Sequence, residues 1–501
     1  MTIARRSLIL AALLPLSGCL VGPDYERPEP AAPPTPDYKE TSDSYFRPAA
    51  PRDSVDRGKW WGMYGDPALD QITAQVDVSN QNLRAAEAAY RQAVAVIRLN
   101  QSALYPTFGY TGSIVQSSSG GSRSGGTIST STIGNSVGQF AVGGSLTWEL
   151  DIWGGIRRSI ESSSAAAQAS AAQLMAARLS AQSSLVINYF SLRITDARSR
   201  TLQDTLVAYG RSLEIVRNQF DAGTVSRVDL AQAQTQYDQT RAQLIAEGVN
   251  RALFEHAIAA LIGRTPAEFS VPPAPPPKSV PTVDAGIPSA LLERRPDIAA
   301  AERQMAAANA QIGVAVSAYY PDITLNASIN FVSSIFANLL SIANAVWSLG
   351  PALAGTAIDG GGRAAQVESA RANYDNTVAT YRQTVITAFQ QVEDALVQQR
   401  ILLQQEEAQA TAVAAARLAE QLALNQYRAG TVPYTTVIQT QTAALAAELA
   451  LLNVRLNRLT ASATLVTALG GGWRDVELPP PVPITGLQTS RELKKKSWWP
   501  F

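Results

Sequence analysis

Residues Gln219–Gln236 read QFDAGTVSRVDLAQAQTQ, and residues Gln426–Thr442 read QYRAGTVPYTTVIQTQT. Each stretch places an aromatic residue two positions before an Ala-Gly pair, continues with Gly-Thr-Val, and ends in a Gln-rich segment. Glycine readily adopts the left-handed backbone conformation that ends helices and forms tight turns. The chain therefore contains two elbows of the same design, which indicates an internal duplication.

The duplication extends outward from the elbows over most of the chain. Residues 80–106 match residues 295–321, and Asp151–Gly155 corresponds to Asp359–Gly362. A repeat of about 210 residues is too long for a solenoid unit. Each copy predicts the same order of elements: a helix, two strands, a very long helix, an elbow and a final helix.

The very long helices are predicted from periodicity. Apolar residues recur at a spacing close to 3.6 residues, and no proline interrupts residues 155–263. A helix of about 65 residues is about 100 Å long, far longer than a compact domain. We expect such helices to pack side by side as nearly straight neighbours.

The charge and composition exclude several classes of function. Lys+Arg and Asp+Glu both number 41, so the sequence gives no electrostatic reason to expect nucleic-acid binding. One Cys and one His exclude an intramolecular disulfide and a His-pair site. The sequence shows no nucleophile–base arrangement and no cluster of metal ligands, so we expect neither an enzyme nor a bound metal.

Two stretches almost without charge occupy the same place in the two copies. Between Arg98 and Glu149 only Arg123 is charged, and no charge lies between Asp322 and Asp359. They predict two membrane β-hairpins, because strands of about ten residues suit a membrane barrel. Four strands cannot close a barrel, and lipid does not tolerate an open edge, so closure requires an oligomer. Two copies would give eight strands with a filled interior, and three give twelve strands with room for a pore.

Aromatic residues in and beside the hairpins are candidates for contacts at the membrane interface. They are Phe108, Tyr110, Phe140, Trp148, Trp153, Tyr319, Tyr320, Phe331 and Trp347.

The N-terminus reads as a targeting segment. A basic start, MTIARR, precedes the short apolar run Ser7–Leu14, which is typical of a secretory signal. The following Leu16-Ser17-Gly18-Cys19 resembles the bacterial lipobox. The resemblance implies that Cys19 becomes the mature first residue and carries S-diacylglycerol and N-palmitoyl groups. Leu20, rather than Asp, implies sorting to the outer membrane.

The predicted organisation has six parts, and the main elements of each copy have predicted bounds. The parts are a signal peptide with lipobox (1–18), a lipidated extended segment (19–58), the first repeat (59–270), a Pro-rich linker (271–288), the second repeat (289–472) and a C-terminal tail (473–501). The elements are membrane hairpins at about 107–151 and 322–358, long helices at about 156–221 and 362–428, elbows at 222–226 and 429–433, and final helices at 227–263 and 434–469.

Several motifs together resemble one protein family. They are the lipobox, KWWGMYGDPALDQI (Lys59–Ile72), LTWELDIWGG (Leu146–Gly155), ERRPDIAAAE (Glu293–Glu302) and the paired elbows. With them the chain resembles the TolC-like outer-membrane factors, in the NodT/OprM-like branch of efflux lipoproteins that serve tripartite RND-type drug pumps. The resemblance covers nearly the whole mature chain.

The resemblance implies a mainly α protein with a membrane β part. It implies a homotrimer whose twelve-stranded outer-membrane barrel continues into a twelve-helix periplasmic tunnel. Such a duct is passive, uses no cofactor other than the covalent lipid, and conducts drugs or other small molecules. Its implied partners are a periplasmic adaptor (a membrane fusion protein), an inner-membrane RND-type pump and outer-membrane lipid.

The resemblance also assigns roles to the elbows, at the periplasmic tip of the tunnel. The tip turns that meet the adaptor map to Gly223, Thr224, Val225, Gly430, Thr431 and Val432. Contacts that close the tip map to Asp229 and Tyr427, with Arg428, Asp221 and Arg227 as charged neighbours. A first-turn acid such as Asp229 is also favoured by the helix dipole alone. Thr436 and Gln439 stand where some members carry acidic rings, which argues against such a ring here.

Two other functions stay open at this stage. One is the outer-membrane channel of a type I protein secretion system, and the other is a non-conducting periplasmic scaffold lipoprotein. The scaffold does not explain two charge-poor hairpins at equivalent positions.

Overall fold

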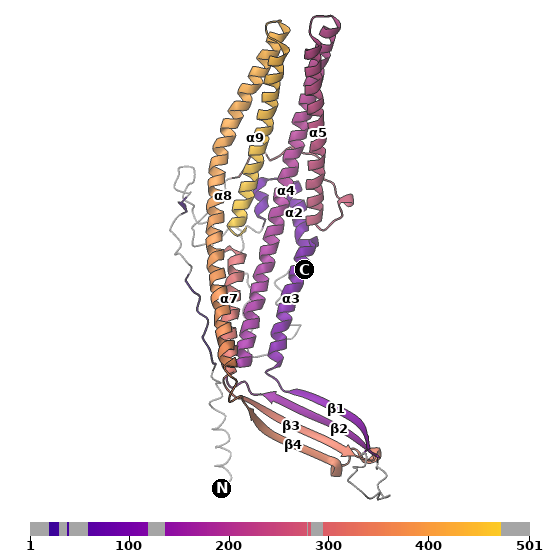
Figure 1. Ribbon diagram of the computed structural model, residues 1–501, viewed down its shortest axis with the longest axis vertical. Coiled ribbons are helices and arrows are strands. Elements are labelled where there is room, and N and C mark those ends of the chain that lie inside the picture. Colours follow the sequence, from indigo (N-terminus) through magenta and orange to yellow (C-terminus); the bar gives the residue numbers. More distant parts are fainter. Residues whose placement is uncertain are drawn as a thin grey trace, which may run out of the picture.

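The computed structural model describes residues 20–29, 38–39, 59–118, 136–277, 279–281 and 294–471. Within them the protein is elongated, with a long helical bundle that carries a four-stranded sheet at one end (Figure 1). The two elbows lie at the end of the bundle that is farthest from the sheet. The predicted signal peptide, Cys19 and the C-terminal tail lie outside the described residues.

The two copies contain the same elements in the same order. A 3₁₀ turn (Trp60–Tyr64) and α2 (Pro67–Ser79) precede the first copy, which consists of α3 (Gln81–Ser102), β1 (Thr107–Ser118), β2 (Ser136–Glu149), α4 (Gly155–Asp221) and α5 (Arg227–Leu261). The second consists of α7 (Pro296–Ser317), β3 (Asp322–Ser333), β4 (Ala345–Ala354), α8 (Gly362–Arg428) and α9 (Tyr434–Ala468). α4 and α8 each contain 67 residues, and α5 and α9 each contain 35. The predicted fold class, mainly helical with a two-fold repeat and a β part, is confirmed.

A carboxylate fixes the start of each long helix. Asp151 accepts from the backbone amide and the Nε of Arg157, both at 3.0 Å. Asp359 accepts from the backbone amide (3.0 Å) and the Nε (2.6 Å) of Arg363. The Arg363 side chain and the backbone amides together lower the pKa of Asp359 to about 2. The Asp359 carboxylate therefore stays ionised at neutral pH, where it complements the positive end of the dipole of α8.

The four strands form one antiparallel sheet in the order β1-β2-β3-β4. β2 ends at Glu149 and β4 at Ala354, before the predicted ends at Asp151 and Ile358. The strands stop early because the chain turns to bring the capping carboxylates to the helices. Representative pairs are Phe108 with Leu146, Val142 with Phe331, and Ala327 with Leu349.

Each of the 35-residue helices ends against the start of a shorter helix. Asn80, the N-cap of α3, donates from Nδ2 to the carbonyl of Leu261 at the end of α5 (2.7 Å). Arg295, the N-cap of α7, donates from Nη1 to the carbonyl of Ala468 at the end of α9 (2.9 Å). These bonds satisfy carbonyls that a helix end leaves unpaired. α3 and α5, like α7 and α9, therefore continue one another beside the long helices (Figure 1).

The main hydrophobic core lies midway along the bundle, where α2, α4, α5 and α9 meet. Tyr189 and Phe190 of α4 are fully buried there. Each large apolar side chain that is fully buried stabilises the fold by about 1.5–3 kcal/mol. The core therefore holds together the half of the bundle beside the sheet and the half that ends in the elbows. Its other members include Leu69, Ile72, Val76, Leu185, Ile258, Ile262 and Leu459.

We predict that Gly263→Ala destabilises the protein more than Gly223→Ala. Both glycines have positive φ angles (68° and 71°), so each substitution carries a left-handed backbone penalty of about 1–2 kcal/mol. A Cβ at Gly263 would also lie 2.1 Å from the carbonyl oxygen of Ser79, whereas nothing lies within 4 Å at Gly223. Thermal unfolding in detergent should show the larger fall in midpoint for Gly263→Ala, and equal falls would contradict the end-to-end helix junction.

Candidate functional site

One face of the sheet is apolar over most of its length. Side chains alternate between faces along a strand, and the register determines which residues share a face. Tyr110 is 86% exposed and Trp347 is 72% exposed on this face. A continuous apolar surface is unusual on a soluble protein and typical of the lipid-facing side of a membrane barrel. The face comprises Phe108, Tyr110, Ile114, Phe140, Val142, Leu146, Trp148, Ile323, Leu325, Ala327, Ile329, Phe331, Ala345, Trp347, Leu349, Pro351 and Leu353.

The opposite face of the sheet carries mostly polar and small side chains. Ser328 and Ser348 share a hydrogen bond of 2.9 Å across β3 and β4 on this side. Glu149 and Asp322 stand at the end of the same face that meets the helices. The sheet therefore has one side suited to lipid and one suited to water. Further polar members are Thr107, Thr111, Ser113, Gln139, Ser145, Thr147, Thr324, Asn326 and Asn330.

Aromatic side chains gather where the sheet meets the helices. Trp148 donates from Nε1 to the carbonyl of Leu104, and Trp153 donates to the carbonyl of Pro321, both at 2.9 Å. The ring of Trp153 stacks on Tyr320 at 4.6 Å between centroids. Tryptophan and tyrosine are typical of a membrane–water interface, because the ring is apolar and its N–H or O–H group can form a hydrogen bond.

The residues that follow Cys19 are fixed to the helices beside the sheet. The amide of Val21 donates to the carbonyl of Trp153 at 3.2 Å. Arg158, only 1% exposed, donates to the carbonyl of Val21 (3.1 Å) and to the carboxylate of Asp24 (2.8 Å). The start of the described chain is thus held at the level of the aromatic cluster. Contacts farther along the bundle join Pro23 to Asn309, Tyr25 to Glu302, Arg27 to Tyr381 and Lys39 to Glu393.

The two elbows have the same backbone geometry. Gly223 and Gly430 have φ angles of 71° and 74°, which reverse the chain between α4 and α5 and between α8 and α9. In each elbow the amide and hydroxyl of the threonine donate to the carbonyl five residues earlier, at 2.9–3.0 Å. These threonines are Thr224 and Thr431, and the valines that follow, Val225 and Val432, are half-buried.

The elbows differ in the residues that begin the next helix. The first begins α5 with a capping box: Asp229 Oδ2 accepts from the amide of Ser226 (3.0 Å), and Ser226 Oγ accepts from the amide of Asp229 (3.2 Å). Pro433 stands at the equivalent position before α9 and provides no side-chain cap. Because such a cap stabilises a helix end by about 0.5–2 kcal/mol, the first elbow is the more firmly fixed.

The two elbows are joined by a hydrogen bond. Tyr427, beside the second elbow, donates its hydroxyl to Oε1 of Gln219 beside the first (2.6 Å). Its ring lies 5.1 Å from that of Tyr434. Burial first, and then the nearby charge of Asp229, raises the pKa of Tyr427, so this hydroxyl keeps its proton at neutral pH. Around this contact Leu213, Val216, Ala233 and Val437 form a small core.

The predicted gate residues are not all brought together within one chain. The hydrogen bonds of the Tyr427 and Asp229 side chains go to Gln219 and Ser226, respectively, rather than to each other. The remaining three, Asp221, Arg227 and Arg428, are exposed and form no ion pair within the part of the chain that the structure describes.

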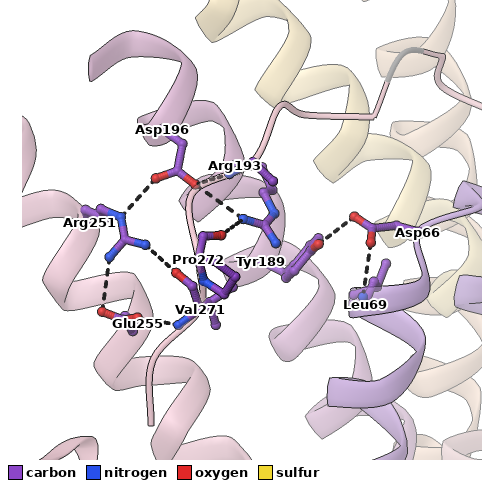
Figure 2. A network of polar contacts seen from close by, with 10 residues as sticks. Asp66, Leu69, Tyr189, Arg193, Asp196, Arg251, Glu255, Val271 and Pro272 are labelled. Atoms are coloured by element: carbon purple, nitrogen blue, oxygen red, sulfur yellow. Dashed lines mark hydrogen bonds and ion pairs between the residues drawn. The ribbon is translucent and has the colours of Figure 1, made fainter. Parts of the chain in front are cut away.

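A buried polar network lies beside the main core (Figure 2). Asp196 of α4 pairs with Arg193 of the same helix (3.3 Å) and with Arg251 of α5 (2.9 Å). Both arginines also hold the segment after α5, because Arg193 donates to the carbonyl of Pro272 (2.7 Å) and Arg251 to that of Val271. The linker between the two copies is therefore pinned to the first copy.

The sequence analysis did not identify this network. The signal available in the sequence was a pair of opposite charges three residues apart, Arg193 and Asp196. A second pair, Arg251 and Glu255, is spaced by four residues. Such pairs usually lie on solvated helix faces, so spacing alone does not distinguish a buried clamp from a surface pair.

Comparisons with known proteins agree with this geometry. Residues 73–264 and 287–471 match the family model of the outer membrane efflux protein. The toluene efflux pump outer membrane protein TtgC of Pseudomonas putida is 31% identical over 490 residues, covering 94% of this chain and 96% of TtgC. The cation efflux system protein CusC of Escherichia coli is 28% identical, covering 92% and 97%. The structure of the outer-membrane channel OprN superposes with a TM-score of 0.81 at 28% identity, covering 91% and 100%.

We predict that Asp196→Asn lowers the free energy of unfolding by about 3–5 kcal/mol, because it leaves the buried Arg193 without its carboxylate, whereas Arg251 keeps Glu255. Arg193 is 2% exposed, so water cannot replace the lost partner. Asp204→Asn is the matched control, since Asp204 is an exposed carboxylate on the same helix, and its effect should stay within about 0.5 kcal/mol. Thermal unfolding measures both, and a wild-type midpoint for Asp196→Asn would show that the network does not hold the linker.

Proposed function

This chain belongs to the outer membrane efflux protein family, and we propose that three copies of it form the exit duct of a tripartite efflux pump. The observation that carries the proposal is a sheet with one apolar face, one polar face and two edges that lack a partner strand in the described chain. The family and its named relatives are channel proteins rather than enzymes. The duct is therefore passive and uses no cofactor, and the inner-membrane pump supplies the energy.

The unpaired edges require a closed ring of subunits. In lipid, a strand edge with free amides and carbonyls is strongly unfavourable, so β1 of one copy pairs with β4 of the next. Rotational symmetry makes each such contact identical around the ring. Three copies of a four-stranded sheet supply twelve strands, which leave a water-filled lumen lined by the polar face.

The helical bundle has two flanks that pack against no other helix of the described chain. They lie on the same two sides as the free strand edges of the sheet. Near the sheet the packing order is α3, α4, α7, α8, and toward the elbows it is α5, α4, α9, α8. α3 and α5 are thus the flank on the β1 side, and α8 is the flank on the β4 side. Exposed apolar residues mark both flanks and support one closure along the whole length. They are Ile245, Val249 and Leu253 on α5, and Ile386, Ile401, Leu418 and Leu422 on α8.

Lipid on Cys19 fits the position of the chain that follows it. The proposed S-diacylglycerol and N-palmitoyl groups belong in the inner leaflet of the outer membrane. Leu20 and Val21 lie beside Gly154 and Trp153, at the aromatic cluster that marks the periplasmic membrane surface. An acyl group on the preceding residue therefore reaches the bilayer without any extended linker.

We assign the elbows to the periplasmic tip, where the adaptor docks and the duct opens. Their distance from the sheet supports this role, as does their shared geometry. The exposed Asp221, Arg227 and Arg428 are placed to pair across copies in the closed state, while Tyr427 joins the two elbows within a copy. Asp229 stabilises the first elbow and contributes negative charge near Tyr427. The adaptor would contact Gly223, Thr224, Val225, Gly430, Thr431 and Val432.

The partners of the duct are a periplasmic adaptor and an inner-membrane RND-type pump. The relatives carry names that refer to toluene and to cations, so closely similar ducts serve chemically unrelated cargo. A passive lumen lined by Ser, Thr and Asn side chains fits that breadth. The pump, rather than this chain, would then select the substrate among drugs and other small molecules.

Planar-bilayer recordings test the proposed channel and its latch. The purified protein should form pores, and Tyr427→Phe should raise their open probability about 2–10-fold for each copy, because one hydrogen bond of about 0.5–1.5 kcal/mol is lost. The ring of the substituted residue can still contact Tyr434, so the packing of the tip is retained.

Tyr105→Phe is the matched control for these recordings, because Tyr105 is exposed near the sheet and far from the elbows. It should behave as the wild type. Absence of pores at every voltage, in the wild type and in tip variants such as Asp229→Ala, would refute the channel. Wild-type gating in Tyr427→Phe would refute only the latch.

A further inference from the structure

The connection between β3 and β4 is an exposed apolar segment at the end of the sheet away from the helices. Residues 334–344 read SIFANLLSIAN and contain no charged residue. Ile342 is 91% exposed, Leu340 is 71% exposed and Phe336 is 69% exposed. An aqueous loop of this length normally carries polar and charged side chains. This segment therefore has the composition of a surface that contacts something apolar.

The segment folds onto the apolar face of the sheet. The ring of Phe336 meets that of Phe140 edge to face, with centroids 5.4 Å apart. Phe140 belongs to the apolar face, since it pairs with Ile114 across β1 and β2. Leu339 is the buried member of the segment, whereas Ile335 is 58% exposed. The exposed apolar residues thus extend the same surface that the strands present.

The backbone of the segment satisfies part of its own hydrogen bonds. Two short 3₁₀ turns, Phe336–Asn338 and Ile342–Asn344, supply bonds of 3.0–3.2 Å between backbone groups. Side chains complete others: Ser333 Oγ donates to the carbonyl of Ile335 (2.8 Å) and accepts from its amide (3.1 Å). Asn344 donates from Nδ2 to the carbonyl of Asn338 at 2.7 Å. Water would satisfy these groups in an aqueous loop, but a lipid environment requires internal partners.

We propose that the exposed apolar side chains of residues 334–344 insert among the acyl chains of the outer leaflet while their backbone stays at the membrane surface, as an apolar cap that anchors the second hairpin of each copy in the membrane. The inference rests on the proposed function, because it requires the sheet to span the outer membrane. The sheet meets the periplasmic helices at its other end, so this cap lies on the outer side. The supporting observations are continuity with the lipid-facing surface through Phe336 and the high exposure of the apolar side chains of the segment.

Spin labels at introduced cysteines test the cap in the full-length protein reconstituted in phospholipid vesicles. The variants are Ile342→Cys in the cap, Leu349→Cys on the apolar face and Ser348→Cys on the polar face. Ile342 is nearly fully exposed, so its substitution leaves the packing intact. The collision rate of each label is measured with oxygen, which concentrates in lipid, and with a water-soluble nickel chelate.

The label at Ile342→Cys should resemble that at Leu349→Cys, with an oxygen-to-nickel ratio several-fold above that at Ser348→Cys. A ratio like that of Ser348→Cys would show that the segment is an aqueous loop, and would overturn the proposal. An immobile label that neither reagent reaches would show that the segment packs on a neighbouring copy, and would also overturn it. Nickel access at Leu349→Cys would instead refute the membrane-spanning sheet, and the cap with it.

Discussion

The need to pair every backbone hydrogen-bonding group inside a membrane governs this structure. The sheet presents an apolar face to lipid, yet β1 and β4 each have an edge without a partner strand in the described chain. Neither edge can remain open in a bilayer, and one chain has too few strands to close on itself. Assembly is therefore part of the fold rather than an addition to it. The same requirement explains the shape of the helical bundle, whose free flanks follow the free strand edges down to the elbows.

The duplication builds a long duct from two copies of the same set of helices. Each copy supplies one helix that runs the full length, α4 or α8, and two shorter helices that meet end to end beside it. Asn80 and Arg295, at equivalent positions in the two copies, close these junctions by satisfying helix carbonyls. The copies differ at their elbows: a capping box fixes the first elbow, whereas Pro433 leaves the second without a side-chain cap.

Much of the architecture could be predicted because its signals are local and repeated. Helical periodicity, the glycine elbows and the charge-free stretches each occur twice, so each occurrence supports the interpretation of the other. The two faces of the sheet could not be predicted, because they depend on a register that places Phe108 opposite Leu146, and no local pattern sets it. The buried network of Arg193, Asp196 and Arg251 was missed because its partners lie in different elements. The tip contacts were assigned by resemblance, and within one chain the hydroxyl of Tyr427 bonds to Gln219, a residue that the resemblance did not single out.

The central claim is that the two sheet edges and the two helical flanks close together into a ring of three copies. Single-particle electron microscopy of the purified protein in lipid nanodiscs tests it directly. The account predicts a threefold particle in which β1 of each copy is hydrogen-bonded to β4 of the next, with the polar face lining a continuous lumen. A monomeric particle, a ring of another number of copies, or a trimer with unpaired β1 and β4 edges in the bilayer would contradict it.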